Sequence, residues 1–154
     1  MATVKSPRRT ATIRDADVMP PEIISRWPTR VEVALVDGDC DADGRLNQNG
    51  AARLFAVARA AYFDKSTAID RGLLTVRTCT IHIGDAPVAG HKVSVSVNVN
   101  ELYEDEFMMT TRMRPTSGAG IAANGSCSLG LAGGVTRAAR DEFIAREHGA
   151  RYTH

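Results

Sequence analysis

The chain has 154 residues, of which 44% are hydrophobic and 24% are charged, and its formal net charge at pH 7 is +1. A single domain of this size can bury a sizeable core, and the near-neutral charge favours neither a nucleic acid nor a membrane as partner. No run approaches the roughly 18 apolar residues of a membrane span. Three cysteines without paired spacing favour a reduced, cytoplasmic setting over a disulfide framework.

The N-terminal 28 residues are polar and contain Pro7, Pro20, Pro21 and Pro28. This composition predicts a flexible arm with one short ordered piece. Residues 29–154 are then expected to form a single domain.

A valine-rich strand is expected over residues 30–36, followed by an aspartate-rich loop over residues 37–47. A helix is expected from Asn47 to about Lys65, with Asn47 or Asn49 as its N-cap. Its apolar residues lie on nearly all sides, so the helix should be buried over most of its circumference.

From residue 74 onward the hydrophobic period changes to two, most clearly where Val93, Val95, Val97 and Val99 alternate with polar residues. The pattern predicts antiparallel strands that wrap around the single apolar helix, with a final helix capped by Gly149. The expected ranges are 74–83, 91–103, 106–114 and 120–131 for the strands and 136–148 for the final helix.

The aspartate-rich loop partly matches a calcium-binding loop. Asp39, Asp41, Asp43 and Gly44 stand where an EF-hand has its first, third, fifth and sixth positions. The twelfth position, which should be a bidentate glutamate, is Gly50, and a strand rather than a helix precedes the loop. We therefore predict no metal site.

A second interpretation is one working carboxylate beside the start of a buried helix. Backbone N–H groups at a helix N-terminus carry about half a positive charge and can polarise a carbonyl oxygen. A carboxylate facing them can attack that carbonyl or activate a water molecule. This arrangement suits hydrolysis of an activated acyl group.

The run Gly38-Asp39-Cys40-Asp41-Ala42-Asp43-Gly44, followed by Asn47 and the helical segment 54–62, resembles the hotdog-fold acyl-CoA thioesterases of the 4-hydroxybenzoyl-CoA thioesterase type. Segment 85–93 resembles that family's proline-to-glycine connection into its third strand. The resemblance covers about residues 30–149. It implies an α+β hotdog fold, in which an antiparallel β-sheet wraps around one long central helix.

The resemblance also implies roles for individual residues. Asp41 aligns with the aspartate that acts as nucleophile or general base on the thioester, and the N–H near Gln48 is the expected carbonyl-polarising donor. Asn47 is expected to be a helix cap that could also orient a water. The implied substrate is an acyl-CoA or an acyl-carrier protein, with no cofactor apart from the substrate's coenzyme A. The implied assembly is a homodimer or a dimer of dimers.

Two positions depart from the family pattern, because Arg45 replaces a common histidine and Gln48 a common asparagine. Arg45 could form an ion pair with Asp41 or Asp43, and it is also a candidate substrate-binding residue. Arg112 and Arg114, on one face of a strand, could meet the phosphates of coenzyme A or simply form a solvated face.

Two alternatives use the same fold. One is a non-catalytic acyl-CoA-binding or sensing module, for which the Arg45 departure leaves room. The other is a hydratase or dehydratase, which is disfavoured because no histidine follows the aspartates within the loop. Among the remaining reactive side chains, Cys79 and Cys127 are interpreted as small core residues.

Overall fold

The computed structural model describes residues 29–117 and 119–152, and describes side chains up to Glu147. The arm predicted for residues 1–28 lies outside the described residues. The elements are β1 (Thr29–Ala34), α2 (Gln48–Asp64), the 3-10 helix η2 (Arg71–Leu73), β2 (Leu74–Ile83), β3 (Lys92–Leu102), β4 (Glu106–Pro115), β5 (Ala123–Leu131) and α3 (Arg137–Tyr152).

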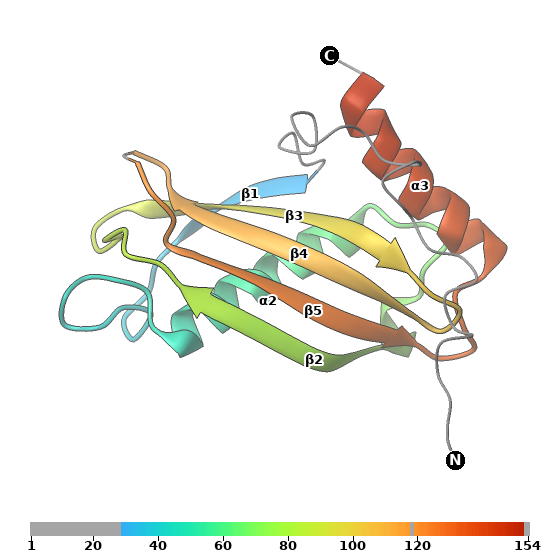
Figure 1. Cartoon of the computed structure of the whole chain (residues 1–154), viewed down its shortest axis with the longest axis horizontal. Helices are drawn as coiled ribbons and strands as arrows, with labels where there is room; N and C mark the ends of the chain where they lie inside the picture. Colours follow the sequence, from blue (N-terminus) through green and yellow to red (C-terminus); the bar gives the residue numbers. More distant parts are fainter. Residues whose placement is uncertain (1–28, 118, 153–154) are drawn as a thin grey trace.

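The strands form one sheet with the order β1-β3-β4-β5-β2, and every neighbouring pair is antiparallel. The sheet curves along α2, which lies against one of its faces (Figure 1). The predicted α+β architecture, a sheet wrapped around one long helix, is therefore confirmed. Strand β2 has the predicted bounds, whereas β1 ends two residues before the predicted limit. Val36 already belongs to a turn, since its carbonyl accepts from the Asp39 N–H.

The core lies between α2 and the face of the sheet that the valines occupy. Val93, Val95, Val97 and Val99 are each at most 1% exposed. They meet an apolar stripe of α2, whose buried side chains recur every three or four residues as one side of a helix requires. The large members of that stripe are Leu54, Phe55, Tyr62 and Phe63.

Helix α3 packs against one end of this core. The Phe143 ring lies 4.8 Å from the Phe107 ring, and Phe63 contacts both rings edge-on. The prediction that Gly149 caps the helix is wrong, because α3 continues to Tyr152. A glycine inside a helix costs only about 1 kcal/mol relative to alanine, so good helix formers on either side can carry the helix through it.

A carboxyl group also anchors α3. Glu147 is 8% exposed, and its Oε2 accepts from the Tyr62 hydroxyl at 2.6 Å and from the Val99 N–H at 2.9 Å. Burial raises the pKa of Glu147 to about 7, although these hydrogen bonds and the Arg146 guanidinium act in the opposite direction. One side chain thereby joins α3, α2 and β3.

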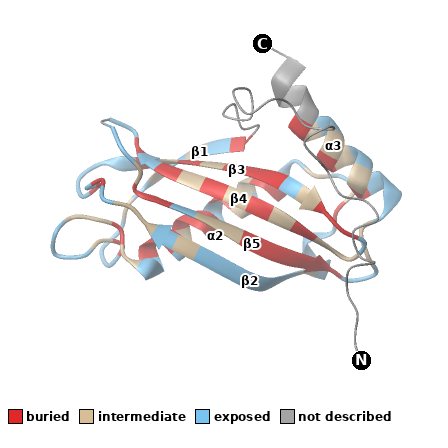
Figure 2. Cartoon of the chain, viewed as in Figure 1, coloured by how far each residue is buried: buried red, intermediate tan, exposed pale blue. Residues whose placement is uncertain are grey.

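Strand β2 is an exposed edge of the sheet. Most of its residues are exposed along both faces (Figure 2), and among the described strands only β5 pairs with it. The prediction that Cys79 is a core residue is wrong for this reason, since its position on the edge strand leaves it exposed. Cys127, its neighbour on β5, is fully buried as predicted.

Candidate active site

The aspartate-rich loop folds into a narrow two-stranded ribbon that leads into α2. The Asn47 N–H donates to the Asp39 carbonyl at 2.9 Å, and the Asp41 N–H donates to the Arg45 carbonyl at 2.8 Å. Between these two bonds, Cys40 and Leu46 form an antiparallel bridge. Gly44 closes the turn with a φ of 82°, a conformation that favours glycine. The ribbon thus gives the loop a fixed shape.

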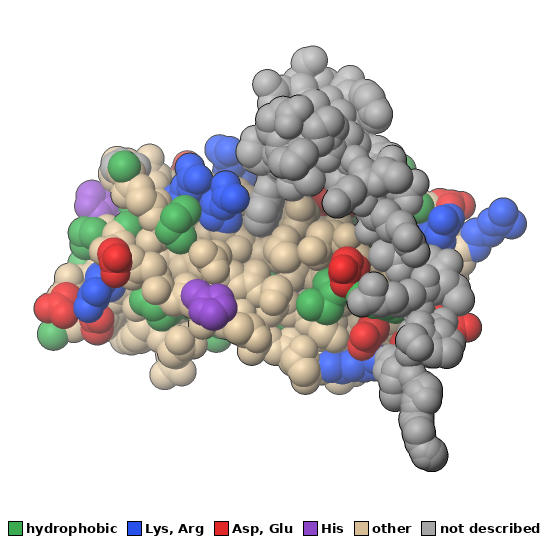
Figure 3. Space-filling model, in the orientation of Figure 1, with side chains coloured by type: hydrophobic (Ala, Val, Ile, Leu, Met, Phe, Trp, Pro, Cys, Tyr) green, Lys and Arg blue, Asp and Glu red, His purple; other side chains and the backbone are tan. Residues whose placement is uncertain are grey.

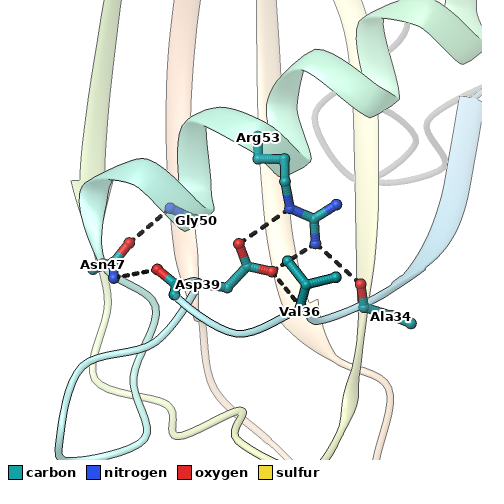
Figure 4. Close-up of polar contacts among 7 residues, drawn as sticks. Ala34, Val36, Asp39, Asn47, Gly50 and Arg53 are labelled. Atoms are coloured by element: carbon teal, nitrogen blue, oxygen red, sulfur yellow. Dashed lines mark hydrogen bonds and ion pairs between the residues drawn. The ribbon is translucent and has the colours of Figure 1, made fainter.

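An ion pair anchors the base of this ribbon to α2 (Figure 4). Asp39 is 4% exposed, and its two oxygens accept from Arg53 Nε at 3.1 Å and Nη2 at 2.6 Å. The same carboxylate accepts from the Val36 N–H at 2.8 Å. The bond to Arg53 is the main cause of a lowered pKa for Asp39, and burial partly opposes it. Asp39 is therefore a structural residue.

The start of α2 is capped as predicted, and Asn47 rather than Asn49 is the cap. The Asn47 Oδ1 accepts from the Gly50 N–H at 2.7 Å, while its Nδ2 donates to the Gly38 carbonyl at 2.7 Å. The side chain therefore joins the loop to the helix in both directions (Figure 4). A Cβ at Gly50 would lie 2.2 Å from the Asp39 carbonyl oxygen, so only glycine permits this approach.

Two N–H groups at the helix start remain available. The first turn of any helix has no intrahelical acceptor for its leading N–H groups. Among the described residues, those of Gln48 and Asn49 have no hydrogen-bond acceptor, and both residues are exposed. They point the positive end of the α2 dipole toward solvent beside the loop. This is an arrangement that can stabilise a developing oxyanion.

Asp41 lies two residues along the ribbon from the Asp39–Asn47 pair, which corresponds to about 7 Å of extended chain. Its Oδ1 accepts from the N–H groups of Asp43 at 2.9 Å and Arg45 at 3.1 Å. The side chain is 40% exposed, so solvent reaches it. Asp41 is thus an accessible, oriented carboxylate near the start of α2.

Arg45 lies among three carboxylates. Its guanidinium is 3.9 Å from Asp41, 3.4 Å from Asp43 and 3.7 Å from Asp85. The expected ion pair is therefore present with both loop aspartates. The Arg45 Nε atom is buried and has no hydrogen-bond partner among the described residues. The charge of Arg45 is balanced by these acids, while one of its donors remains unused.

Arg112 and Arg114 lie elsewhere. Both belong to β4, where Phe107, Met109 and Met113 point into the core, so the two arginines point to the face away from α2. Figure 3 shows that face, where Lys and Arg side chains gather at the end at which β4 ends. The structure therefore places both arginines on the face of the sheet opposite α2 rather than beside the start of that helix (Figure 1).

A groove of about 210 Å³ lies between α2 and β2. Ala56 of α2 lies eight residues after Gln48, so the groove begins about 12 Å along the helix from the free N–H groups. Small side chains of α2 and apolar side chains of the sheet form its walls, with two arginines beside them. The lining residues are Ala56, Arg59, Ala60, Phe63, Arg71, Leu74, Val76 and Leu129.

Sequence reasoning missed Arg53 and the role of Gly50. Arg53 stands 14 residues from Asp39, a separation at which no local pattern reports a contact. A signal for Gly50 was present, because a glycine in the first turn of an otherwise alanine-rich helix has to have a packing reason. The packing reason is the Asp39 carbonyl oxygen, which leaves no room for a Cβ at residue 50.

Within residues 29–117 and 119–152, no three His, Cys, Asp or Glu side chains come together in a way that could hold a metal ion. No helix of this described part is both long and apolar enough to cross a membrane.

Comparison with known proteins gives matches in structure alone. No family model matches the chain, and no curated protein matches its sequence. A thioesterase from Thermus thermophilus, solved with coenzyme A and zinc, is 25% identical with a TM-score of 0.66, over 79% of this chain and 96% of that one. A thioesterase-superfamily protein from Jannaschia is 17% identical with a TM-score of 0.69, over 85% and 94%.

A 4-hydroxybenzoyl-CoA thioesterase is also similar in structure. It is an aspartate-to-asparagine variant solved with 4-hydroxybenzoyl-CoA, and it is 14% identical with a TM-score of 0.57, over 66% of this chain and 81% of that one. At 14% identity this likeness shows the fold alone and does not show that the chain is of the 4-hydroxybenzoyl-CoA thioesterase type. The comparisons agree with the strand order and the central helix, and the chain has the hotdog fold of these thioesterases.

Proposed function

We propose that the protein is a thioesterase that hydrolyses an acyl-CoA or acyl-carrier-protein thioester. The observation that supports the proposal is the ribbon that leads from the accessible Asp41 carboxylate into the start of α2, where the N–H groups of Gln48 and Asn49 have no acceptor among the described residues. Similarity to thioesterases solved with coenzyme A and with an acyl-CoA supports the same conclusion.

In the proposed reaction, the thioester carbonyl oxygen accepts hydrogen bonds from the N-terminus of α2. The negative charge that develops on this oxygen is stabilised by N–H groups that are already oriented. Asp41 either attacks the carbonyl carbon or removes a proton from an attacking water molecule. In the first route an anhydride forms, the coenzyme A thiolate leaves, and water then cleaves the anhydride. Both routes give a carboxylic acid and a free thiol.

The surrounding residues have supporting roles in this proposal. Asn47 orients the start of α2 through its cap and its bond to Gly38. Arg45 balances the charge of the loop acids, including Asp41, at distances of 3.4 to 3.9 Å. We assign both as positioning residues, since their contacts are with the protein itself.

The groove between α2 and β2 is the proposed acyl site. It begins about 12 Å along α2 from Gln48, a distance that an acyl chain can span from its carbonyl. Apart from Arg59 and Arg71 its lining residues are apolar, which suits a hydrocarbon chain. Arg112 and Arg114 lie on the opposite face of the sheet, where they could bind the coenzyme A phosphates only if the nucleotide reached around the end of β4.

We further propose that the protein works as a homodimer or a dimer of dimers. Among the described residues only β5 pairs with β2, so the other edge of β2 presents unpaired backbone groups, and Val57 of α2, Leu73 of η2 and Val76 of β2 are exposed large apolar residues. Light scattering on a gel-filtration column measures the mass. A monomer at micromolar concentration would contradict this part of the proposal.

The hydrolase assignment is tested with purified protein and a panel of short, long and aromatic acyl-CoAs. Release of free thiol is followed with a chromogenic disulfide, and we expect turnover of at least one member. If acyl-CoAs bind in calorimetry but release no thiol, and acyl-carrier-protein thioesters are also intact, the protein is no thioesterase.

One observation favours the alternative of a non-catalytic acyl-CoA-binding module. The Asp41 carboxylate is already held by two N–H groups of its own loop and faces Arg45. A carboxylate held in this way can serve the loop's shape alone. Binding without thiol release is the outcome that this alternative predicts.

A further inference from the structure

The groove between α2 and β2 is apolar except for two arginines, Arg59 of α2 and Arg71 of η2. Arg71 has a counter-ion, because its Nη1 atom forms an ion pair with Asp64. Arg59 is half-buried and, within the described part of the chain, its guanidinium forms no ion pair and no hydrogen bond. The groove therefore contains one positive charge that no acid of the described residues balances.

The Arg59 guanidinium lies against the helix and close to the sheet. Its central carbon atom lies 4.9 Å from the centre of the Phe55 ring. Phe55 is fully buried and stands about one turn nearer to the start of α2, so the Arg59 side chain leans back along the helix, as helical side chains do. Burial raises the pKa of Cys127 on β5 to about 11, and the positive charge of Arg59 acts in the opposite direction. The Arg59 charge is therefore close enough to the sheet to act on β5.

Arg59 is also aligned with the proposed reaction centre. It follows Gln48 by eleven residues, which is about three helical turns, so both residues lie on the same side of α2. Along the helix axis, Arg59 is roughly 16 Å from Gln48, and Phe55 beneath the guanidinium is roughly 10 Å from it. An acyl chain that begins at the Gln48 N–H and runs along α2 therefore meets the guanidinium with its far end.

The unpaired charge makes an otherwise apolar groove selective. A plain hydrocarbon tail that filled the groove would remove water from Arg59 without giving it a partner, and removing water from an unpaired charge is costly. A tail that ends in a carboxylate instead supplies the counter-ion, since a guanidinium binds a carboxylate through two parallel hydrogen bonds. The groove therefore favours a tail that is apolar along its length and anionic at its end.

We propose that the groove selects acyl thioesters whose acyl chain carries a second carboxylate at its far end, and that Arg59 binds this carboxylate. This proposal rests on the proposed function, because it takes the groove to be the acyl site of a thioesterase. It requires no movement of β2 and is compatible with a second copy paired along the edge of β2, because Arg59 belongs to α2.

The test uses two coenzyme A thioesters of equal chain length, octanoyl-CoA with a methyl end and octanedioyl-CoA with a carboxylate end. We expect kcat/KM of the wild type to be at least about tenfold higher for octanedioyl-CoA, mainly through a lower KM. Arg59→Gln should remove this preference, whereas Arg59→Lys, which retains a positive charge, should keep part of it. Arg71→Gln is the matched control, because Arg71 already has a counter-ion, and it should change the preference by less than about twofold.

Calorimetry with the same two thioesters separates this proposal from the hydrolase assignment. If octanedioyl-CoA binds more tightly than octanoyl-CoA in wild type but not in Arg59→Gln, and no thiol is released, the selectivity stands and the hydrolase assignment fails. If both thioesters are hydrolysed with equal kcat/KM, the hydrolase assignment stands and the selectivity is overturned. This comparison needs only the wild type, so it decides the matter even if Arg59→Gln does not fold.

Three further outcomes would overturn the selectivity. One is a preference for octanedioyl-CoA that survives Arg59→Gln in a protein with unchanged circular dichroism. Another is an equal loss of preference in Arg71→Gln, which would remove the assignment to Arg59. The third is that neither thioester binds, which would also contradict the hydrolase assignment for these chains.

Discussion

The Arg53 guanidinium joins the Asp39 carboxylate to the last residue of β1. Its Nη2 atom lies 2.6 Å from Asp39 Oδ2 and donates to the Ala34 carbonyl at 3.1 Å, while Nε lies 3.1 Å from Asp39 Oδ1. The strand, the loop and the helix therefore meet in one planar, bidentate contact. This contact fixes where α2 starts relative to the loop that contains Asp41.

Replacing Asp39 with Asn should destabilise the protein by about 2–4 kcal/mol, because Arg53 would lose a buried counter-charge. Urea unfolding measures the change. Asp43→Asn is the matched control, since that side chain is 76% exposed and should change stability by less than about 0.5 kcal/mol. Equal stabilities of the two variants would contradict the assignment of Asp39 as an anchor.

The Asp39 pair also predicts an acid-labile contribution to stability. The pKa of Asp39 is lowered in the folded protein from its ordinary 3.8, so the contribution is present above that value. It is lost as the pH falls through the lower pKa of the folded state. Wild type and Asp39→Asn should therefore converge in stability at strongly acidic pH. A gap that stays constant into that range would show that the carboxylate charge has no part in the contact.

Gly50→Ala should destabilise the protein although alanine favours helices by about 1 kcal/mol. The new Cβ would stand 2.2 Å from the Asp39 carbonyl oxygen, so the loop or the helix has to move. Thermal unfolding measures the effect, and Ala52→Gly at an exposed site of α2 provides the propensity control. A stabilised Gly50→Ala protein would show that the loop can shift without cost.

Much of the fold follows from the sequence because its signals are local. The valine alternation fixes which side of β3 is buried, and the apolar helical segment defines α2 almost to the residue. The Asn47 cap could be predicted for the same reason, since the cap oxygen and the Gly50 N–H that donates to it lie three residues apart. Local spacing therefore predicts elements and their caps.

Contacts between distant residues could not be predicted in this way. Glu147 binds Tyr62 across 85 residues, although a carboxylate four residues after Phe143 on the buried stripe of α3 was a usable hint. The exposure of Cys79 depends on which strand forms the edge of the sheet, and that is a property of topology. The face occupied by Arg112 and Arg114 likewise depends on where α2 packs.

Glu147 predicts a second pH effect, of opposite sign. Its pKa is raised from 4.5 to about 7 in the folded protein, so the folded state binds the extra proton more tightly. The protonated Glu147 carboxyl stabilises the folded protein, and this contribution is complete below pH 4.5. The contribution is lost as the pH rises through about 7, and the free energy of unfolding then falls by up to about 3 kcal/mol. Stability measured against pH should show this fall in wild type and lack it in Glu147→Gln. Parallel curves would refute the assignment.

The groove between α2 and β2 predicts chain-length selectivity. Ala56→Phe would fill part of the groove, so KM should rise for long acyl-CoAs and stay within about twofold for short ones. Ala52→Phe is the control, because Ala52 is exposed on the same helix and does not line the groove. A uniform effect on all chain lengths would place the acyl chain elsewhere.

In the proposed reaction the Asp41 carboxylate performs the chemistry. The most direct test compares kcat of the Asp41→Asn and Asp43→Asn variants on the acyl-CoA that the wild type hydrolyses best. Both residues are exposed loop aspartates that contact Arg45. Comparing the two variants therefore distinguishes an effect of the Asp41 position from an effect of removing one negative charge near Arg45. We expect Asp41→Asn to lose at least about 100-fold in kcat with bound acyl-CoA retained in calorimetry, and Asp43→Asn to keep most activity. Wild-type turnover by a folded Asp41→Asn protein would contradict the claim.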